Sequence, residues 1–292
     1  MADENEEFDG YHEPDEEGPD EEEERPRDAQ IDVAKVSLMR DLFAVKPDDV
    51  FYQRQVEVLF EKPFFHWITA KALHELAAEG QIMTEERQHP GFRMNLFWSP
   101  KNRYWKRRAT QIENLVLRFS DSEFTRGLGH HGETMFDAAL PQAGFMPVAK
   151  NVRSYDGRTW TKSRHNLDRV FVKDGLPYGI EIKNTLGYMD REELEIKLDM
   201  CRHLGLTPLF IVRMVPASYM ELVHRRFGIT LIVEWQLYPH GQEAFAKEIE
   251  AELGLKVGCP KAIHEGTIKR LARLHDSLLE RMKRAQQEDE NP

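Results

Sequence analysis

Two acidic side chains and a lysine lie close together in a stretch of mostly apolar sequence. Asp168 begins one apolar run, and Glu181 and Lys183 alternate with Ile180 and Ile182 in the next. If the second run is a strand, its two-residue period puts Glu181 and Lys183 on one face and both isoleucines on the other. Converging carboxylates bind a hard divalent cation, and a neighbouring ammonium group can orient an attacking water. These residue types therefore predict metal-dependent hydrolysis of a phosphodiester.

A tight turn is expected to bring the two acidic residues within reach of each other. Residues 173–175 have the Lys-Asp-Gly sequence that is typical of a hairpin turn, and they separate the apolar runs 167–173 and 178–184. An antiparallel hairpin folds Asp168 back beside Glu181. The sequence thus predicts a cleft lined by both carboxylates.

The order of elements around this hairpin resembles that of the PD-(D/E)XK nuclease superfamily, which includes restriction, repair and junction-resolving enzymes. The superfamily order is a helix, three strands, a helix and a strand, and the resemblance covers residues 124–235. The matching segments expected here are a helix at 125–140, strands at 145–155, 167–173 and 178–184, a helix at 190–204 and a strand at 209–215.

This resemblance implies a role for each matching residue. It implies that Glu133, Asp168, Glu181 and Lys183 are catalytic, and that Asp168, Glu181 and the carbonyl of Ile182 hold Mg²⁺, for which Mn²⁺ can substitute. Glu133 would support the metal through a water or a second ion. The implied fold is α/β, a restriction-endonuclease-like mixed sheet flanked by helices, and the implied activity is that of a DNA endonuclease. The alternative is a catalytically idle member of this fold that binds nucleic acid or serves as an assembly subunit.

A second Glu-x-Lys sequence occurs at Glu195 and Lys197. It lies in a segment rich in Glu, Leu and Lys that is expected to be helical, where residues two apart point to different sides. We therefore interpret it as a solvated helix face and expect replacement of Glu195 or Lys197 to have little effect.

The charge of the chain is distributed unevenly. The formal net charge is −11, but residues 1–28 contain fifteen acidic and two basic side chains, so the remainder carries about +2. Such an acidic segment of low hydrophobicity cannot bury enough apolar surface to fold, and residues 1–30 are expected to be a disordered tail. It is interpreted as a solvating tail or as a mimic of nucleic acid that covers the basic cleft.

Residues 31–98 are expected to form a separate winged-helix-like domain. Helical patterns at 50–60 and 67–78 precede two short extended segments, 81–83 and 92–98, which read as a wing. Such a domain could dock on DNA, or it could mediate homodimerisation or bind a partner protein, because the second helix carries few basic residues.

A basic segment with two aromatic residues follows, in the expected connector 99–123. Cations at this spacing neutralise phosphates, and aromatic rings stack on exposed bases. A second basic group lies on the loop that precedes Asp168. The alternative interpretation of the first segment is a solvated charge run packed by one buried tryptophan. The residues expected to bind nucleic acid are Lys101, Arg103, Tyr104, Trp105, Lys106, Arg107, Arg108, Arg158, Lys162 and Arg164.

The rest of the chain completes the expected organisation. The nuclease-like domain is expected to span 124–258, with a further strand at 229–235 and a helix at 242–253. Residues 259–292 are expected to hold a C-terminal helix, at 267–285, and a polar tail. That helix could pack on its own domain or support a dimer.

The chain shows no sequence signal for a membrane or a disulfide framework. No apolar run approaches the length of a membrane span, and the N-terminus is acidic where a signal peptide would be basic. Cys201 and Cys259 are too few for a disulfide framework or a zinc quartet. A cytoplasmic protein with reduced thiols is expected.

Overall fold

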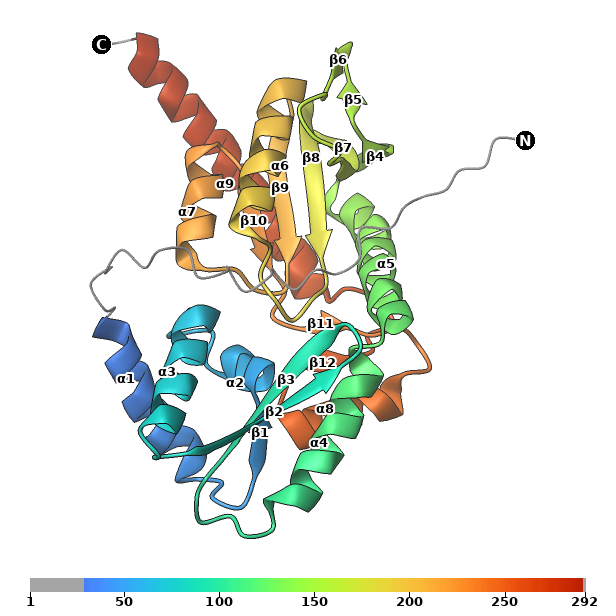
Figure 1. The fold of residues 1–292 in the computed structure, drawn as a ribbon. Helices are drawn as coiled ribbons and strands as arrows, with labels where there is room; N and C mark the ends of the chain where they lie inside the picture. The colour runs from blue at the N-terminus through green and yellow to red at the C-terminus, as the bar shows by residue number, and fades with distance from the viewer. Residues whose placement is uncertain (1–28, 291–292) are drawn as a thin grey trace. The chain divides into compact units, whose positions relative to one another are not determined.

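The computed structural model describes residues 29–290, which fall into two compact units that divide between Phe124 and Thr125 (Figure 1). We call them unit 1 and unit 2. Most of the expected tail, residues 1–28, lies outside the described residues, whereas Ala29 and Gln30 belong to the first helix.

Unit 1 combines four helices and a short π-helical segment with a small antiparallel sheet. The sheet has the strand order β1-β3-β2, and β2 and β3 form a hairpin. Its second strand lies at 92–98, as predicted for the wing, whereas its first strand lies at 83–89 and not at 81–83. The elements are α1 (Ala29–Leu38), η1 (Met39–Phe43), β1 (Val50–Tyr52), α2 (Gln53–Leu59), α3 (His66–Ala78), β2 (Met83–His89), β3 (Phe92–Trp98) and α4 (Trp105–Phe119).

Two expectations for unit 1 need correction. The helix predicted from residue 50 begins at Gln53, because residues 50–52 form β1 and pair with β3. Residues 99–123, expected as a connector, contain α4, whose buried side chains recur at helical spacing and which packs on β1. Basic residues around its first turn hide this pattern in the sequence.

Unit 2 is built around a five-stranded mixed sheet. Its strand order is β10-β9-β8-β7-β4; β8, β9 and β10 are parallel to one another, whereas β7 is antiparallel to both β8 and β4. The strands are β4 (Met146–Val152), β7 (Leu167–Lys173), β8 (Leu176–Lys183), β9 (Thr207–Val212) and β10 (Ile229–Ile232). The α/β class of the fold is therefore confirmed.

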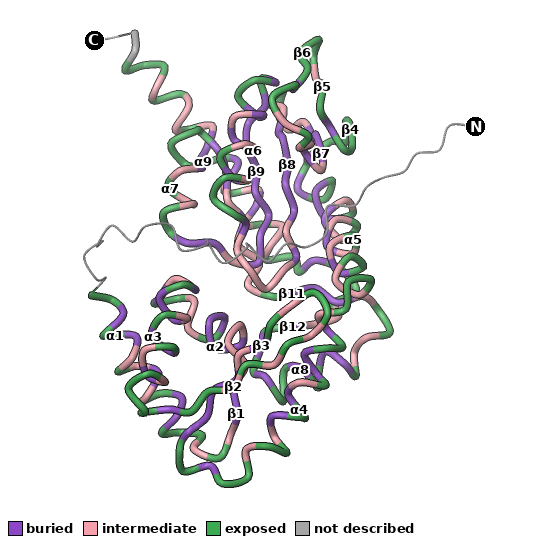
Figure 2. Tube along the Cα trace, in the orientation of Figure 1, coloured by how far each residue is buried: buried purple, intermediate pink, exposed green. Residues whose placement is uncertain are grey.

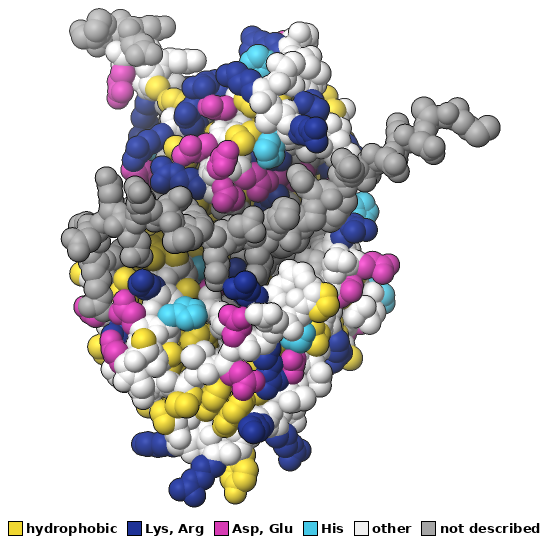
Figure 3. Space-filling view, viewed as in Figure 1, with side chains coloured by type: hydrophobic (Ala, Val, Ile, Leu, Met, Phe, Trp, Pro, Cys, Tyr) yellow, Lys and Arg dark blue, Asp and Glu magenta, His cyan; other side chains and the backbone are white. Residues whose placement is uncertain are grey.

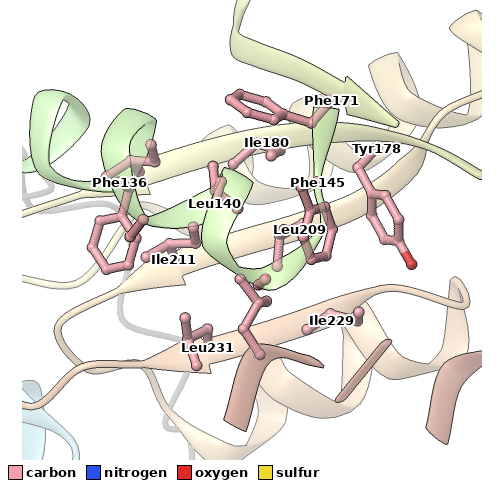
Figure 4. Packing of buried hydrophobic residues seen from close by; sticks show 14 of the residues in the cluster. Phe136, Leu140, Phe145, Phe171, Tyr178, Ile180, Leu209, Ile211, Ile229 and Leu231 are labelled. Atoms are coloured by element: carbon pink, nitrogen blue, oxygen red, sulfur yellow. The ribbon is translucent and has the colours of Figure 1, made fainter. Parts of the chain in front are cut away.

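Helices cover both faces of this sheet. On one face, α5, the 3₁₀ turn η2 and α9 bury the apolar side of β8 and β9, and Figure 4 shows Phe136, Leu140, Ile180 and Ile211 in this core. On the other face, α6 and α7 pack against β9 and β10. The two central strands are consequently buried along most of their length (Figure 2). These elements are α5 (Ser122–Ala139), η2 (Leu140–Ala143), α6 (Arg191–Leu204), α7 (Ala217–Arg225) and α9 (Glu265–Glu290).

The hairpin that carries the candidate site has the predicted form. Lys173 pairs with Leu176, which leaves Asp174 and Gly175 as a two-residue turn, and both have positive φ, 49° and 79°. A turn with two positive φ angles matches the twist of the flanking strands, and Asp-Gly suits it because glycine has no Cβ to clash.

The helix that follows β8 begins and ends at residues that favour these positions. The carboxylate of Asp190 accepts hydrogen bonds from the backbone N–H groups of Glu192 and Glu193, and Gly205 closes α6 in the left-handed conformation. The expected helix at 190–204 is therefore confirmed.

Short elements complete unit 2. The strands β5 and β6 form a small hairpin, β11 and β12 a small parallel pair, and α8 precedes β12. Among the described residues, no helix is long and apolar enough to cross a bilayer. The bounds are β5 (Ser154–Tyr155), β6 (Arg158–Thr159), β11 (Gln236–Leu237), α8 (Glu243–Leu253) and β12 (Val257–Gly258).

Candidate active site

Asp168 and the start of the Glu-x-Lys sequence lie side by side on β7 and β8. The Oδ2 atom of Asp168 accepts a hydrogen bond of 2.8 Å from the backbone N–H of Ile182. Ile180 and Ile182 point into the core on the α5 face, so Glu181 and Lys183 occupy the opposite face, as the alternation predicts. The structure thus brings Asp168, Glu181 and Lys183 together.

Glu181 is the most enclosed member of the site, with 2% of its surface exposed. Its Oε2 atom lies 2.8 Å from the ammonium nitrogen of Lys197, and its Oε1 atom lies 3.4 Å from that of Lys183. Lys183 also approaches Glu193, at 2.8 Å. Two residues of α6, Lys197 and Glu193, therefore belong to the site.

The expectation that Lys197 lies on a solvated helix face is wrong. Lys197 is buried, and besides Glu181 it donates to the backbone carbonyl of Asn166. Glu195, in contrast, is exposed and pairs with Arg191 on the same helix. The apolar residues Leu194, Leu198 and Cys201 recur at helical spacing, and position 197 falls on the same buried face. That spacing was the sequence signal that could have identified Lys197.

Burial, together with nearby negative charge, makes the two carboxyl groups less acidic than usual. Burial and the negative charge of Asp168 together raise the pKa of Glu181 to about 7, against the opposing effect of Lys197 and Lys183. Burial also raises the pKa of Asp168, while Lys197 and the Ile182 N–H oppose this effect. The site therefore favours the protonated form of both carboxyl groups more than water does, although two lysines lie nearby.

The pKa of the Lys183 ammonium group is also raised, which favours its charged form. Burial alone would lower its pKa, but the charges of Glu181 and Glu193 outweigh burial and raise the pKa above its ordinary value. Lys183 is consequently a charged hydrogen-bond donor throughout the neutral range. It can orient water or a phosphate oxygen, but it cannot accept a proton there.

Glu133 lies on α5 and is held by Arg169 of β7. The guanidinium group lies 2.8 Å from Glu133 Oε2 and 2.8 Å from Asp137 Oδ1, and Asp137 also pairs with Lys150. Arg169 is buried, so this network fixes α5 against β7. The charge of Glu133 still raises the pKa of Asp168. Arg169 and Asp137 were not among the predicted site residues.

Asn184, directly after the Glu-x-Lys sequence, fixes the end of β8. Its side-chain amide donates to the carbonyls of Leu128 and Leu237 and accepts from the Leu237 N–H, all at 2.7–2.8 Å. The neighbouring helix can approach because residue 132 is glycine: a Cβ there would lie 2.7 Å from the Asn184 Cβ. This contact sets the position of α5 beside the site.

The donor set fits a hard divalent cation at Asp168 and Glu181. Both groups supply carboxylate oxygens, the Ile182 carbonyl lies between Glu181 and Lys183 in the chain, and added positive charge would favour the ionised form of the two carboxyl groups, whose pKa values are raised chiefly by burial. Within residues 29–290, no cluster of three or more His, Cys, Asp or Glu side chains is arranged to hold a metal. A cation here would therefore depend on two carboxylates, a carbonyl and water, and one ammonium group would have to leave Glu181.

The basic segment in unit 1 divides into exposed and engaged residues. Trp105 is half-buried and stacks on Trp98, with ring centroids 4.1 Å apart, so one face of its ring is already covered. Arg108 pairs with Asp49 at 2.6 Å. Tyr104 is 87% exposed, and Lys and Arg side chains gather around this loop (Figure 3). The exposed cations are Lys101, Arg103, Lys106 and Arg107.

The basic loop before Asp168 also carries exposed cations. Arg158 packs against Gly205 and lies 3.5 Å from the His203 carbonyl, at the C-terminal end of α6. Lys162 lies over the ring of Trp160 at 5.6 Å. Arg158, Lys162 and Arg164 are all exposed, and Arg158 in addition joins the β5–β6 hairpin to α6.

A comparison of the chain with protein-family models, curated proteins and solved structures gives no match. The functional interpretation consequently depends on the residues and geometry described above.

Proposed function

We propose that this protein is a metal-dependent DNA endonuclease whose catalytic domain, in unit 2, is of the PD-(D/E)XK type. One observation carries the proposal: Asp168 and Glu181 lie together on neighbouring strands with raised carboxyl pKa values, beside the charged Lys183. Two buried carboxyl groups with raised pKa values beside a charged lysine are more typical of a functional site than of a structural ion pair.

The order of elements supports the same proposal. The helix α5 is followed by β4, β7 and β8, then by α6 and β9, which is the order on which the resemblance to the PD-(D/E)XK superfamily was based. The carboxylates and the lysine lie on β7 and β8 within that series. The restriction-endonuclease-like architecture is accordingly part of the proposal.

In the proposed reaction, Asp168, Glu181 and the Ile182 carbonyl would hold Mg²⁺, or Mn²⁺ in its place. The bound cation would supply positive charge at the scissile phosphate and a more acidic water. Lys183 donates hydrogen bonds to the attacking water or to a phosphate oxygen. Arg169 holds Glu133 and the rest of α5 beside the two ligands.

Unit 1 is proposed to be a winged-helix-like module. Its order of helix, strand, two helices and hairpin, together with the β1-β3-β2 sheet, supports this assignment. Its exposed basic loop, at Lys101 and Arg103, suits the DNA backbone, whereas the outward residues Trp67 and Lys71 of α3 suit either DNA or a partner protein.

The experiment that tests the function is a cleavage assay on several forms of DNA. Purified protein and the Asp168→Ala variant are incubated with supercoiled plasmid, linear duplex, single strands and a four-way junction, in Mg²⁺, Mn²⁺ or chelator. The proposal predicts metal-dependent cleavage that the variant loses while it still binds DNA. Absence of cleavage by the unaltered protein on every form would count against it.

One observation favours a second candidate, an idle nuclease fold that binds DNA or assembles with a partner. Both carboxylate oxygens of Glu181 already have an ammonium group nearby. If the site is idle, these contacts persist at high Mg²⁺ concentration, and the same assay shows DNA binding without cleavage.

A further inference from the structure

Lys197 and Lys183 contact the same carboxylate in very different surroundings. The Lys197 side chain is 4% exposed, and it bridges Glu181 on β8 and the Asn166 carbonyl, at the end of the loop that leads into β7. The Lys183 side chain is 31% exposed and lies closer to Glu193, at 2.8 Å, than to Glu181, at 3.4 Å. The Lys197–Glu181 contact is therefore buried, and Lys197 has a second partner that holds it in place. The Lys183–Glu181 contact is partly exposed, and Lys183 is already shared with Glu193.

Moving either lysine away from Glu181 has very different consequences. Withdrawing Lys197 would leave a buried ammonium group without its carboxylate and would release the loop end at Asn166, which is strongly unfavourable. Withdrawing Lys183 requires only a small movement toward Glu193, with solvent available to the rest of the side chain. The Oε1 side of Glu181 is thus the side that can open.

From this difference we infer that α6 is part of the proposed active site. Lys197 is a positioning residue that keeps its contact with Glu181, whereas the divalent cation displaces Lys183 from Glu181 and Lys183 keeps its contact with Glu193. The inference deepens the proposed function and depends on it. Lys197 fixes the Oε2 atom, which would leave Oε1 available to the cation. Lys183, released from Glu181 but retained by Glu193, stays at the edge of the site, where it can meet the water or phosphate.

Binding of Mn²⁺ alone, without DNA, tests this division. Free Mn²⁺ is titrated by electron paramagnetic resonance with the full chain, the Lys183→Met variant and the Lys197→Met variant. Lys247, an exposed lysine on α8, provides the control Lys247→Met. Lys183→Met should bind Mn²⁺ about tenfold more tightly than the unaltered protein, because it removes a competing unit charge about 4 Å away. Lys197→Met should bind no more tightly, and Lys247→Met should match the unaltered protein.

Two adverse outcomes are distinguishable. Tighter binding by Lys197→Met than by Lys183→Met would overturn the division between the lysines and leave the metal site intact. No Mn²⁺ binding by any of the four proteins would refute the metal site, and with it the proposed function.

A crystal of the unaltered protein soaked in Mn²⁺ gives a reading that does not depend on the folding of a variant. The expected result is anomalous density between Asp168 and Glu181, with the Lys197–Glu181 contact retained and Lys183 directed at Glu193. Density at that position with the Lys197 contact broken would overturn the inference.

Discussion

Replacing Glu181 by glutamine should remove a large pH dependence from the stability of the protein. Burial and the Asp168 charge raise the pKa of Glu181 from the ordinary 4.5 to about 7. Because the folded state holds this proton more tightly than the unfolded state, the stabilisation is complete below pH 4.5 and is lost as the pH rises through 7. A difference of this size corresponds to about 3 kcal/mol, and solvent screening reduces it little because the side chain is 2% exposed.

The assay is urea unfolding of the unaltered protein and Glu181→Gln at several pH values from 4.5 to 8.5, in chelator. Subtracting the two free energies of unfolding cancels the other titrating groups. The difference, unaltered protein minus variant, should fall by about 3 kcal/mol across this range. Adding Mg²⁺ should reverse much of the fall, since a cation at Asp168 and Glu181 favours the ionised form.

A difference that stays constant with pH would refute this reasoning, and so would one that increases with pH. An increase would mean that the two lysines outweigh burial and hold the pKa of Glu181 below its ordinary value. Glu195→Gln, which alters an exposed carboxylate on α6, is the matched control and should show no such trend.

Three further predictions concern packing and charge. Gly132→Ala should destabilise the protein by about 1–3 kcal/mol, because the new methyl group meets Asn184, whereas Gly129→Ala on the same helix meets nothing within 4 Å and should be neutral or stabilising in urea unfolding. Tyr178→Phe should cost about 1–3 kcal/mol in the same assay, because it leaves Nδ1 of the fully buried His275 without its 2.7 Å partner; an unchanged midpoint would contradict this. Removing the four exposed cations of the basic segment should weaken DNA binding and reduce the slope of log K against log salt by about 3.6, as measured by fluorescence anisotropy, and an unchanged slope would exclude them from the interface. The substitutions are Lys101→Gln, Arg103→Gln, Lys106→Gln and Arg107→Gln.

The hairpin of β7 and β8 could be predicted because its determinants are local. Alternation places Glu181 and Lys183 on one face, and the Asp174-Gly175 turn specifies antiparallel pairing. The helix at 190–204 was equally accessible, since Asp190 and Gly205 mark its ends. Elements without such marks were missed, among them α7 and the helix of the basic segment.

The partners of the site residues could not be predicted in the same way. The contact between Lys197 and Glu181 depends on which face of α6 packs on the sheet, and the pairing of Arg169 with Asp137 joins residues 32 positions apart. A charged residue on a helix is usually solvated, so charge alone pointed to the wrong surroundings for Lys197. The helical spacing of position 197 from Leu194 and Leu198 places it on the buried face of α6.

The most direct measurement of the central claim compares two matched carboxylates in one cleavage time course. Glu181→Gln and Glu195→Gln each remove one negative charge from a Glu-x-Lys sequence, the first in the proposed site and the second on the exposed side of α6. With Mg²⁺ and the preferred DNA substrate, the rate should fall by at least about 100-fold in Glu181→Gln and stay unchanged in Glu195→Gln. Loss of cleavage in Glu195→Gln together with full activity in Glu181→Gln would contradict the assignment of the site.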